Sequence, residues 1–184
     1  SVAARCGVDI IWKPILVGGV FNSVNETVYE QRANPHPVKG RYYVKDLRDW
    51  ANFCGVKIGN PPVFPVRAVT IMRACFVALD AGCLPAFAKA AFEAYWGDLK
   101  DISQPEEIAA IAQSVGLDVG HLAAAIQSDD VKARLRDNTE ELIARGGFGS
   151  PTMFINEQDM YFGNDRLVLV KAALMAAQNQ KTQA

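Results

Sequence analysis

The chain has 184 residues, of which half are hydrophobic and 21% are charged, and its formal net charge is −1. This composition can bury a sizeable core in one large domain or in a small domain that carries an insertion. The near-neutral charge argues against a nucleic-acid or anionic-membrane surface, and no apolar run is long enough to span a bilayer. We therefore expect a soluble cytoplasmic protein whose partner is a small molecule or another copy of itself.

The chain has four cysteines, and no two of them have the C-x-x-C spacing of a dithiol redox centre. They are Cys6, Cys54, Cys75 and Cys83, and the last three fall among apolar residues of predicted helices or at helix ends. A buried free cysteine behaves as a small hydrophobic residue. We interpret all four as reduced structural residues and expect no metal site.

The first residues indicate that a segment precedes this sequence. The chain begins at Ser1 without a methionine, and residues 2–6 have the pattern of the last turns of a helix that ends at Gly7. We expect a preceding strand and loop, and any nucleophile on that loop, to lie outside the sequence. Residues 8–12 are mostly β-branched or aromatic and are bounded by Gly7 and Pro14, which predicts a strand buried on at least one face.

Residues 15–34 are predicted to form an irregular loop. They contain the pair Gly18-Gly19 and a cluster of Asn and Ser that includes Asn25, and both features favour turns. The sequence Asn-Pro-His-Pro at 34–37 then predicts a rigid turn. Because long ordered loops often carry function, this segment is a candidate functional loop.

The middle of the chain is predicted to be entirely helical. The sequence Ser-Gln-Pro-Glu at 103–106 has the pattern of a capping box, and the glycine-rich residues 146–149 end the last helix. Apolar residues recur at helical spacing in segments that we place at residues 44–55, 69–79, 87–95, 105–115, 118–127 and 130–145.

The period of the pattern changes after residue 149. Residues 152–155 and 160–162 are predicted to form the strands of a hairpin, and apolar residues from 167 to 177 predict a final helix. A hairpin and a terminal helix, joined to an early helix and strand, are the halves of a thioredoxin fold in their usual order. The predicted fold is α/β, a thioredoxin-like sheet with an all-helical insertion. The thioredoxin-like domain would comprise residues 1–39 and 146–184, and the insertion residues 40–145.

Ser150-Pro151 directly precedes the first strand of the predicted hairpin. Proline cannot donate to a sheet ladder, so it lies only at a strand start, an edge or a bulge. In a thioredoxin-like context a cis bond is possible here. It would turn the main-chain N–H and C=O of Ser150 outward, where they can pair with the backbone of a peptide.

Residues 163–166, Gly-Asn-Asp-Arg, open the final helix. Asn or Asp at such a position is first of all a helix N-cap, and capping alone explains the pattern. The same geometry presents free N–H groups to a carboxylate, and Asp165 could hold an ammonium group. Glutathione, a short peptide with a carboxylate and an ammonium on one carbon, would satisfy both this motif and Ser150-Pro151.

Two segments carry a specific family resemblance: Gly-Ser-Pro-Thr-Met-Phe at 149–154 and Phe-Gly-Asn-Asp-Arg-Leu at 162–167. They resemble the C-terminal half of the 2-hydroxychromene-2-carboxylate isomerases and of their relatives, the kappa-class glutathione transferases. The resemblance implies a DsbA-like thioredoxin fold with a helical insertion, a glutathione cofactor and a homodimer. Weaker similarity extends over the rest of the chain, at Pro14, 39–43, 63–65, Trp96 and 101–102.

The resemblance implies a glutathione site on these two segments. The main chain of Ser150, beside Pro151, would pair with the cysteinyl part of glutathione. Asn164 and Asp165, helped by Arg166, would hold the γ-glutamyl end.

Two residues outside these segments resemble family residues near the glycyl end and the mouth of the active site. They are Asn25 and Lys39, which have ordinary explanations as a turn residue and a solvated lysine. His36 is predicted to be a loop residue rather than a base. Arg73 is either a helix-surface residue or a ligand for a substrate carboxylate.

The resemblance implies a glutathione-dependent isomerase of aromatic catabolism, acting on 2-hydroxychromene-2-carboxylate or a related aryl pyruvate. In this family the glutathione thiolate adds reversibly to a conjugated double bond, the resulting single bond rotates, and elimination returns the isomer. A family serine activates the thiol from the loop after the first strand, which we expect ahead of Ser1, so no catalytic residue is assigned. The alternatives are a kappa-class-like transferase, a DsbA-like disulfide oxidoreductase with C-x-x-C in the preceding segment, and a non-catalytic glutathione-binding protein.

Overall fold

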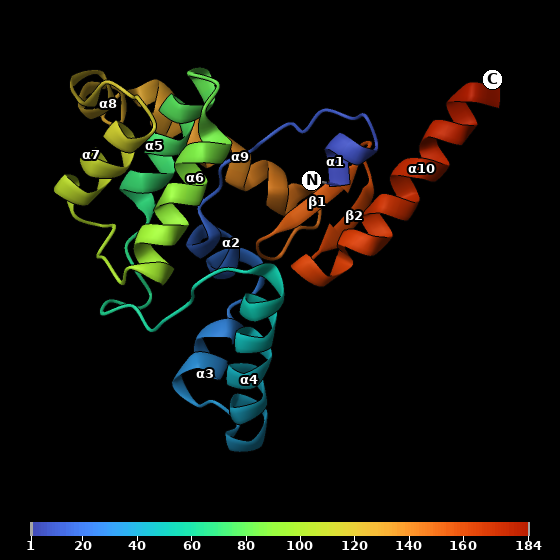
Figure 1. Cartoon of the computed structure of the whole chain (residues 1–184), viewed down its shortest axis with the longest axis horizontal. Coiled ribbons are helices and arrows are strands. Elements are labelled where there is room, and N and C mark those ends of the chain that lie inside the picture. Colours follow the sequence, from blue (N-terminus) through green and yellow to red (C-terminus); the bar gives the residue numbers. More distant parts are fainter. Residues whose placement is uncertain (1, 184) are drawn as a thin grey trace. The chain divides into compact units, whose positions relative to one another are not determined.

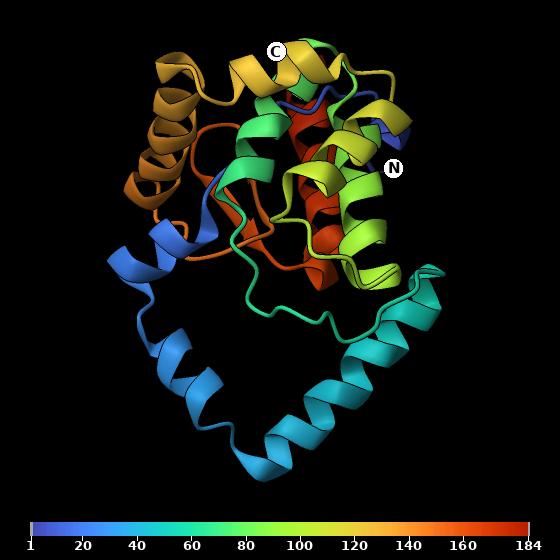
Figure 2. The ribbon, with the colours of Figure 1, turned by 90° about the vertical axis from the view of Figure 1, so that its left-hand side faces the viewer.

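A computed structural model of the chain describes residues 2–183, with side chains for residues 2–179. The chain forms two compact units, and its elements are shown in Figures 1 and 2. The first unit contains the described residues up to 13, residues 17–26 and residues from 138 onward; the second contains residues 14–16 and 27–137. The domain limits predicted from the sequence stay a prediction. None of the helices within residues 2–183 has the length and apolar character that a membrane crossing requires.

The first unit is built around a two-stranded antiparallel sheet. Strands β1 (Thr152–Ile155) and β2 (Asp159–Phe162) pair with Thr152 opposite Phe162 and Ile155 opposite Asp159. Helix α10 (Leu167–Gln183) packs against β1 and against the short helix α1 (Val2–Arg5). The predicted hairpin and terminal helix are therefore confirmed.

Residues 8–12 form no strand, so the strand prediction for them is wrong. Within the described part of the chain the sheet contains only β1 and β2, and residues 8–12 pair with neither. Ile11 is 84% exposed, so this segment is not buried on one face either. β-branched residues favour a strand only where a neighbouring strand can pack beside them, and composition does not reveal such a neighbour.

Helices α2 (Val17–Val24) and α3 (Thr27–Ala33) occupy most of residues 15–34, so the prediction of an irregular loop there is wrong. Each glycine of the Gly18-Gly19 pair costs a helix about 1 kcal/mol relative to alanine. Packing outweighs this cost because Val20, the next residue, is completely buried.

Gly19 also allows α2 to approach α9 (Asp129–Ala144) closely. A Cβ at Gly19 would lie 3.2 Å from Cγ2 of Thr139, which is itself buried. That is tighter than an ordinary van der Waals contact, so the absent side chain is part of the packing.

The second unit is entirely helical within the residues that the structure describes. Its core lies among α5 to α8, where Ala74, Phe87 and Ala112 are fully buried. A second cluster joins Phe76 of α5 to Val131 and Leu135 of α9. Besides α3 and the first part of α9, its elements are α4 (Pro37–Cys54), α5 (Val69–Asp80), α6 (Leu84–Phe92), the π-helix η1 (Glu93–Gly97), α7 (Pro105–Ser114) and α8 (Val119–Ala125).

Helix α4 begins at Pro37, earlier than the helical spacing predicts, because His36 caps it. His36 Nδ1 accepts hydrogen bonds from the N–H groups of Val38 and Lys39, at 3.3 and 3.4 Å. The histidine therefore satisfies helix donors that would otherwise face solvent.

The capping box predicted at residues 103–106 is wrong, although α7 begins at Pro105 as expected. The Ser103 hydroxyl donates to Asp101 Oδ1 at 2.6 Å instead of accepting a bond from the helix. Asp101 also accepts from the Ser103 N–H at 3.0 Å, so a local turn precedes the helix and takes the place of the box.

We expect Gly18→Ala and Gly19→Val to change stability in opposite directions. Nothing lies within 4 Å of a Cβ at Gly18, so alanine should raise the free energy of unfolding by roughly 0.5–1 kcal/mol through helix propensity. At Gly19 the new side chain meets Thr139, and overpacking should lower that free energy by about 1–3 kcal/mol. Urea denaturation measures both. A Gly19→Val protein as stable as Gly18→Ala would contradict the close approach of α2 and α9.

Candidate functional site

The hairpin brings the two predicted glutathione motifs together. The N–H of Gly163 donates to the C=O of Pro151 at 3.0 Å, one step beyond the last ladder pair, Thr152 and Phe162. Ser150 and Asn164 are the next residues out along each chain, so both motifs lie at the same end of the sheet (Figure 1).

The Ser150–Pro151 peptide bond is cis, as the sequence suggested it could be. Ser150 is exposed, and among the described residues neither its N–H nor its C=O forms a hydrogen bond. The Thr152 hydroxyl donates to the C=O of Gly149 at 2.7 Å and so ties the segment before Ser150 to the start of β1. Ser150 therefore presents a main-chain donor and acceptor on a fixed support.

Asn25 is placed beside this segment, as predicted. Its Nδ2 donates to the C=O of Phe148 at 3.1 Å. The Phe148 ring packs on the ring of Phe162, with centroids 4.5 Å apart. A Cβ at Gly149 would lie 3.0 Å from the Phe162 ring, so only glycine fits between these contacts. The loop that leads to Ser150 is thus held by α2 on one side and by β2 on the other.

Residues 163–166 form a tight turn and the short 3-10 helix η2 (Asn164–Arg166) ahead of α10. Gly163 has φ +101°, and a Cβ there would lie 2.7 Å from Asp165 Oδ1, so the Asp165 carboxylate folds back over the glycine. Asp165 forms an ion pair with Arg166, and both side chains are about half exposed. Within residues 2–183, neither Asn164 nor Asp165 bonds a helix N–H through its side chain, so the capping interpretation is wrong for these residues.

Lys39 lies in α4, in the second unit, and its side chain is exposed. Its own N–H is one of the two that His36 caps. The predicted place of Lys39 at the mouth of the site stays a prediction.

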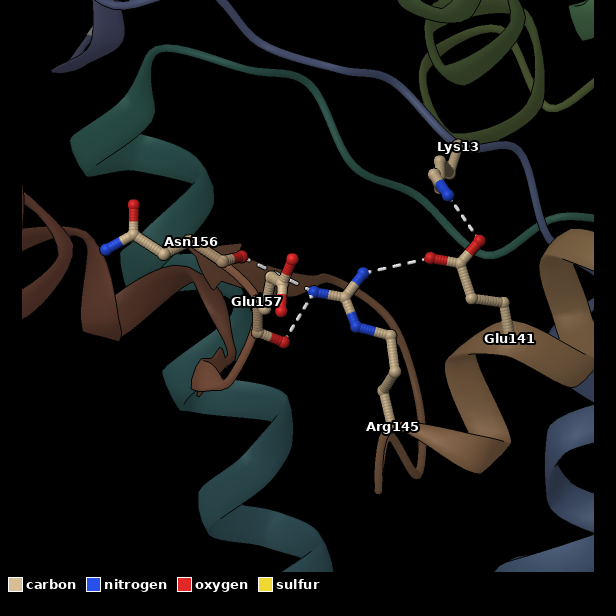
Figure 3. Close-up of polar contacts among 5 residues, drawn as sticks. All are labelled: Lys13, Glu141, Arg145, Asn156 and Glu157. Atoms are coloured by element: carbon tan, nitrogen blue, oxygen red, sulfur yellow. Dashed lines mark hydrogen bonds and ion pairs between the residues drawn. The ribbon is translucent and has the colours of Figure 1, made fainter.

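The other end of the hairpin is held by Arg145, which the sequence analysis missed (Figure 3). Its Nη2 donates to the C=O of Glu157 in the turn between β1 and β2 at 2.9 Å. Its Nη1 donates to Glu141 at 3.0 Å, and its Cζ lies 3.7 Å from the ring centroid of Phe154. The Glu141–Arg145 spacing was a visible sequence signal, but nothing in the sequence linked Arg145 to the turn.

Glu141 is shared between Arg145 and Lys13, which pairs with the same carboxylate (Figure 3). The hydrogen bond from Lys13, aided by the one from Arg145, lowers the pKa of Glu141 below its usual value. We name this group, Lys13, Glu141 and Arg145 with the Glu157 carbonyl, the hairpin clamp.

All four cysteines are free. Burial raises the pKa of the Cys75 thiol to about 12, which suppresses its thiolate at neutral pH. Cys54, on α4, is exposed. Within the described residues no cluster of three or more His, Cys, Asp or Glu side chains has the arrangement of a metal site.

Comparisons with known proteins agree with this architecture. A family model described as a DSBA-like thioredoxin domain matches residues 1–175. A 2-hydroxychromene-2-carboxylate isomerase of Sphingobium xenophagum is 27% identical over 183 residues, covering 95% of this chain and 87% of the relative. The glutathione S-transferase kappa 2 of Caenorhabditis elegans is 26% identical over 168 residues, covering 84% of this chain and 73% of the relative.

A solved 2-hydroxychromene-2-carboxylate isomerase structure matches with a TM-score of 0.79 at 23% identity, covering 99% of this chain and 87% of the other. At that identity the match bears on the fold alone. Together with the family model, it confirms the predicted DsbA-like thioredoxin fold.

We expect the hairpin clamp to make stability depend on pH through Glu141. Its pKa is lower in the folded than in the unfolded state, so the stabilisation is present above the unfolded value of about 4.3 and is lost as the pH falls through the folded value. Glu141→Gln should therefore lose less stability than the wild type between neutral pH and the acid range. Urea midpoints across this range measure the difference.

The exposed Glu26→Gln is the matched control and should retain the wild-type dependence. If Glu141→Gln and the wild type lost stability in parallel, the ionised Glu141 would not contribute to the clamp.

Proposed function

Since the chain belongs to the family of DSBA-like thioredoxin domains, we propose that it is a glutathione-dependent isomerase of 2-hydroxychromene-2-carboxylate or a related aryl pyruvate. One observation carries the proposal: the Gly163–Pro151 hydrogen bond joins the two motifs into one surface. The isomerase of Sphingobium xenophagum, matched over 95% of this chain, supports the reaction class.

The two motifs fit the two ends of glutathione. The free N–H and C=O of Ser150 suit the main chain of the cysteinyl residue. Asp165 would receive the γ-glutamyl ammonium, and Asn164 and Arg166 its carboxylate. Because Asp165 and Arg166 already pair with each other, this zwitterionic end would replace one ion pair by two.

The chain's own residues would bind and orient glutathione. Ser150 would fix the cysteinyl main chain and hence the position of the thiol, and Asn25 would steady the loop before it. Bound glutathione would supply a thiolate that adds reversibly to the conjugated double bond of the substrate and leaves after rotation. Lys39 is proposed at the mouth of the site, and the activating serine expected ahead of Ser1 stays a prediction.

A kappa-type glutathione transferase is the second candidate, favoured by the similarity to the Caenorhabditis elegans transferase. It would use the same glutathione site, but the thiolate would stay bonded to the electrophile. In either case we propose a cytoplasmic homodimer. Large exposed apolar side chains, such as Phe53 on α4 and Val168 on α10, support an association surface.

Asp165→Ala should weaken glutathione binding by about ten- to a hundredfold. A hydrogen bond to a charged group is worth roughly 1.5–3 kcal/mol, and each 1.4 kcal/mol is about a factor of ten in affinity. Lys39→Ala should cost less because its side chain is exposed. Isothermal titration calorimetry gives the affinities, and melting temperatures measured on the same samples separate a lost contact from a less stable fold.

Glu157→Ala is the matched control, because Glu157 lies at the opposite end of the same hairpin and contacts Arg145 through its main chain. Its glutathione affinity should equal that of the wild type. Unchanged affinity in folded Asp165→Ala would contradict the site. Turnover of 2-hydroxychromene-2-carboxylate with and without glutathione then distinguishes an isomerase from a non-catalytic binding protein.

A further inference from the structure

An aromatic surface in the second unit is not used by the glutathione site. Phe64 and Trp96 lie with ring centroids 5.9 Å apart, and Phe64 is 59% exposed. The guanidinium carbon of Arg32, from α3, lies 5.7 Å from the centre of the Phe64 ring. We name these three residues the Phe64 surface. It combines flat apolar faces with one adjacent positive charge.

The two rings of the Phe64 surface are held by the structure around them. The Trp96 ring packs edge-on against Tyr95, with centroids 4.8 Å apart. The Tyr95 hydroxyl donates to the C=O of Val63 at 2.7 Å, so it anchors the residue next to Phe64. The C=O of Trp96 accepts from the N–H of Gly59 at 2.7 Å. The rings are therefore positioned before any ligand arrives.

Uncommon backbone conformations border the same surface. Trp96 lies in the π-helix η1, a form that occurs frequently at functional sites. Leu99, just after it, has φ +60°, which non-glycine residues rarely adopt. A Cβ at Gly59 would lie 2.8 Å from Leu99 Cδ2, so the packing here requires glycine. Such conformations persist where the surrounding structure determines them, and they cluster at binding sites.

We propose that the Phe64 surface binds a small planar aromatic carboxylate, with the ligand ring against Phe64 and Trp96 and its carboxylate on Arg32. Aromatic rings prefer offset-stacked or edge-to-face contacts with other rings. A guanidinium can bind a carboxylate through two parallel hydrogen bonds and can rest on an aromatic face at the same time. A protein partner would need about 800 Å² on each side, far more than two rings provide.

This inference deepens the proposed function and rests on it for the use of the site, because an aryl pyruvate is itself an aromatic carboxylate. Binding at the Phe64 surface nevertheless requires no glutathione. An experiment without glutathione therefore tests this surface alone, and the calorimetry of Asp165→Ala tests the glutathione site alone.

The test labels the full chain with 5-fluorotryptophan and follows its three tryptophans by fluorine NMR, with Trp12→Phe and Trp50→Phe to assign the signals. trans-Cinnamate is the probe. We expect it to shift the Trp96 signal in a saturable way and to leave the Trp12 and Trp50 signals in place. Cinnamyl alcohol, which lacks the charge, and 3-cyclohexylpropanoate, which lacks the arene, should each bind at least about tenfold more weakly.

Two variants assign the roles within the Phe64 surface. Arg32→Ala should weaken cinnamate binding about tenfold and leave cinnamyl alcohol unchanged, whereas Phe64→Ala should weaken both. Arg136→Ala and Phe53→Ala remove an exposed arginine and an exposed phenylalanine elsewhere in the second unit, and they should change neither. The proposal is overturned if cinnamate leaves the Trp96 signal unshifted, if it binds no more tightly than the alcohol, or if Arg32→Ala in a folded protein binds it as the wild type does.

Discussion

The hydrogen bond from the Gly163 N–H to the Pro151 C=O is the contact on which the candidate site depends. It extends the β1–β2 ladder by one step and fixes which residues face each other across the open end of the hairpin. A slip of one residue in an antiparallel pair would move every side chain to the other face. Ser150 and Asp165 could then no longer contact the two ends of one short peptide.

Both ends of the hairpin are fixed by contacts from helices of the same unit. Asn25 of α2 holds the loop that leads to Ser150, and Arg145 of α9 holds the turn at Glu157. Binding groups on loops need such a rigid support, because a loop alone does not keep its polar groups in one geometry. The hairpin clamp is therefore a positioning device for a site at the opposite end of two short strands.

The sequence predicted those parts of the fold and site that have a local signal. Helical spacing located α5 to α9, and the change of period after residue 149 located the hairpin that joins the two motifs. Features set by tertiary contacts were missed. The pair Gly18-Gly19 suggested a loop because its close packing on Thr139 is not visible in the sequence. Residues 8–12 suggested a strand, and Arg145 gave no sign of the turn carbonyl that it binds.

Amide chemical shifts of the isotope-labelled chain, recorded during a titration with glutathione, test the central claim most directly. The account predicts that the largest saturable changes occur at Ser150 and at residues 163–166, with smaller changes at the turn around Glu157. Because the motifs form one surface, both groups of signals should report the same dissociation constant. Changes confined to one motif, or centred on residues away from the open end of the hairpin, would contradict a glutathione site built on the Gly163–Pro151 pairing.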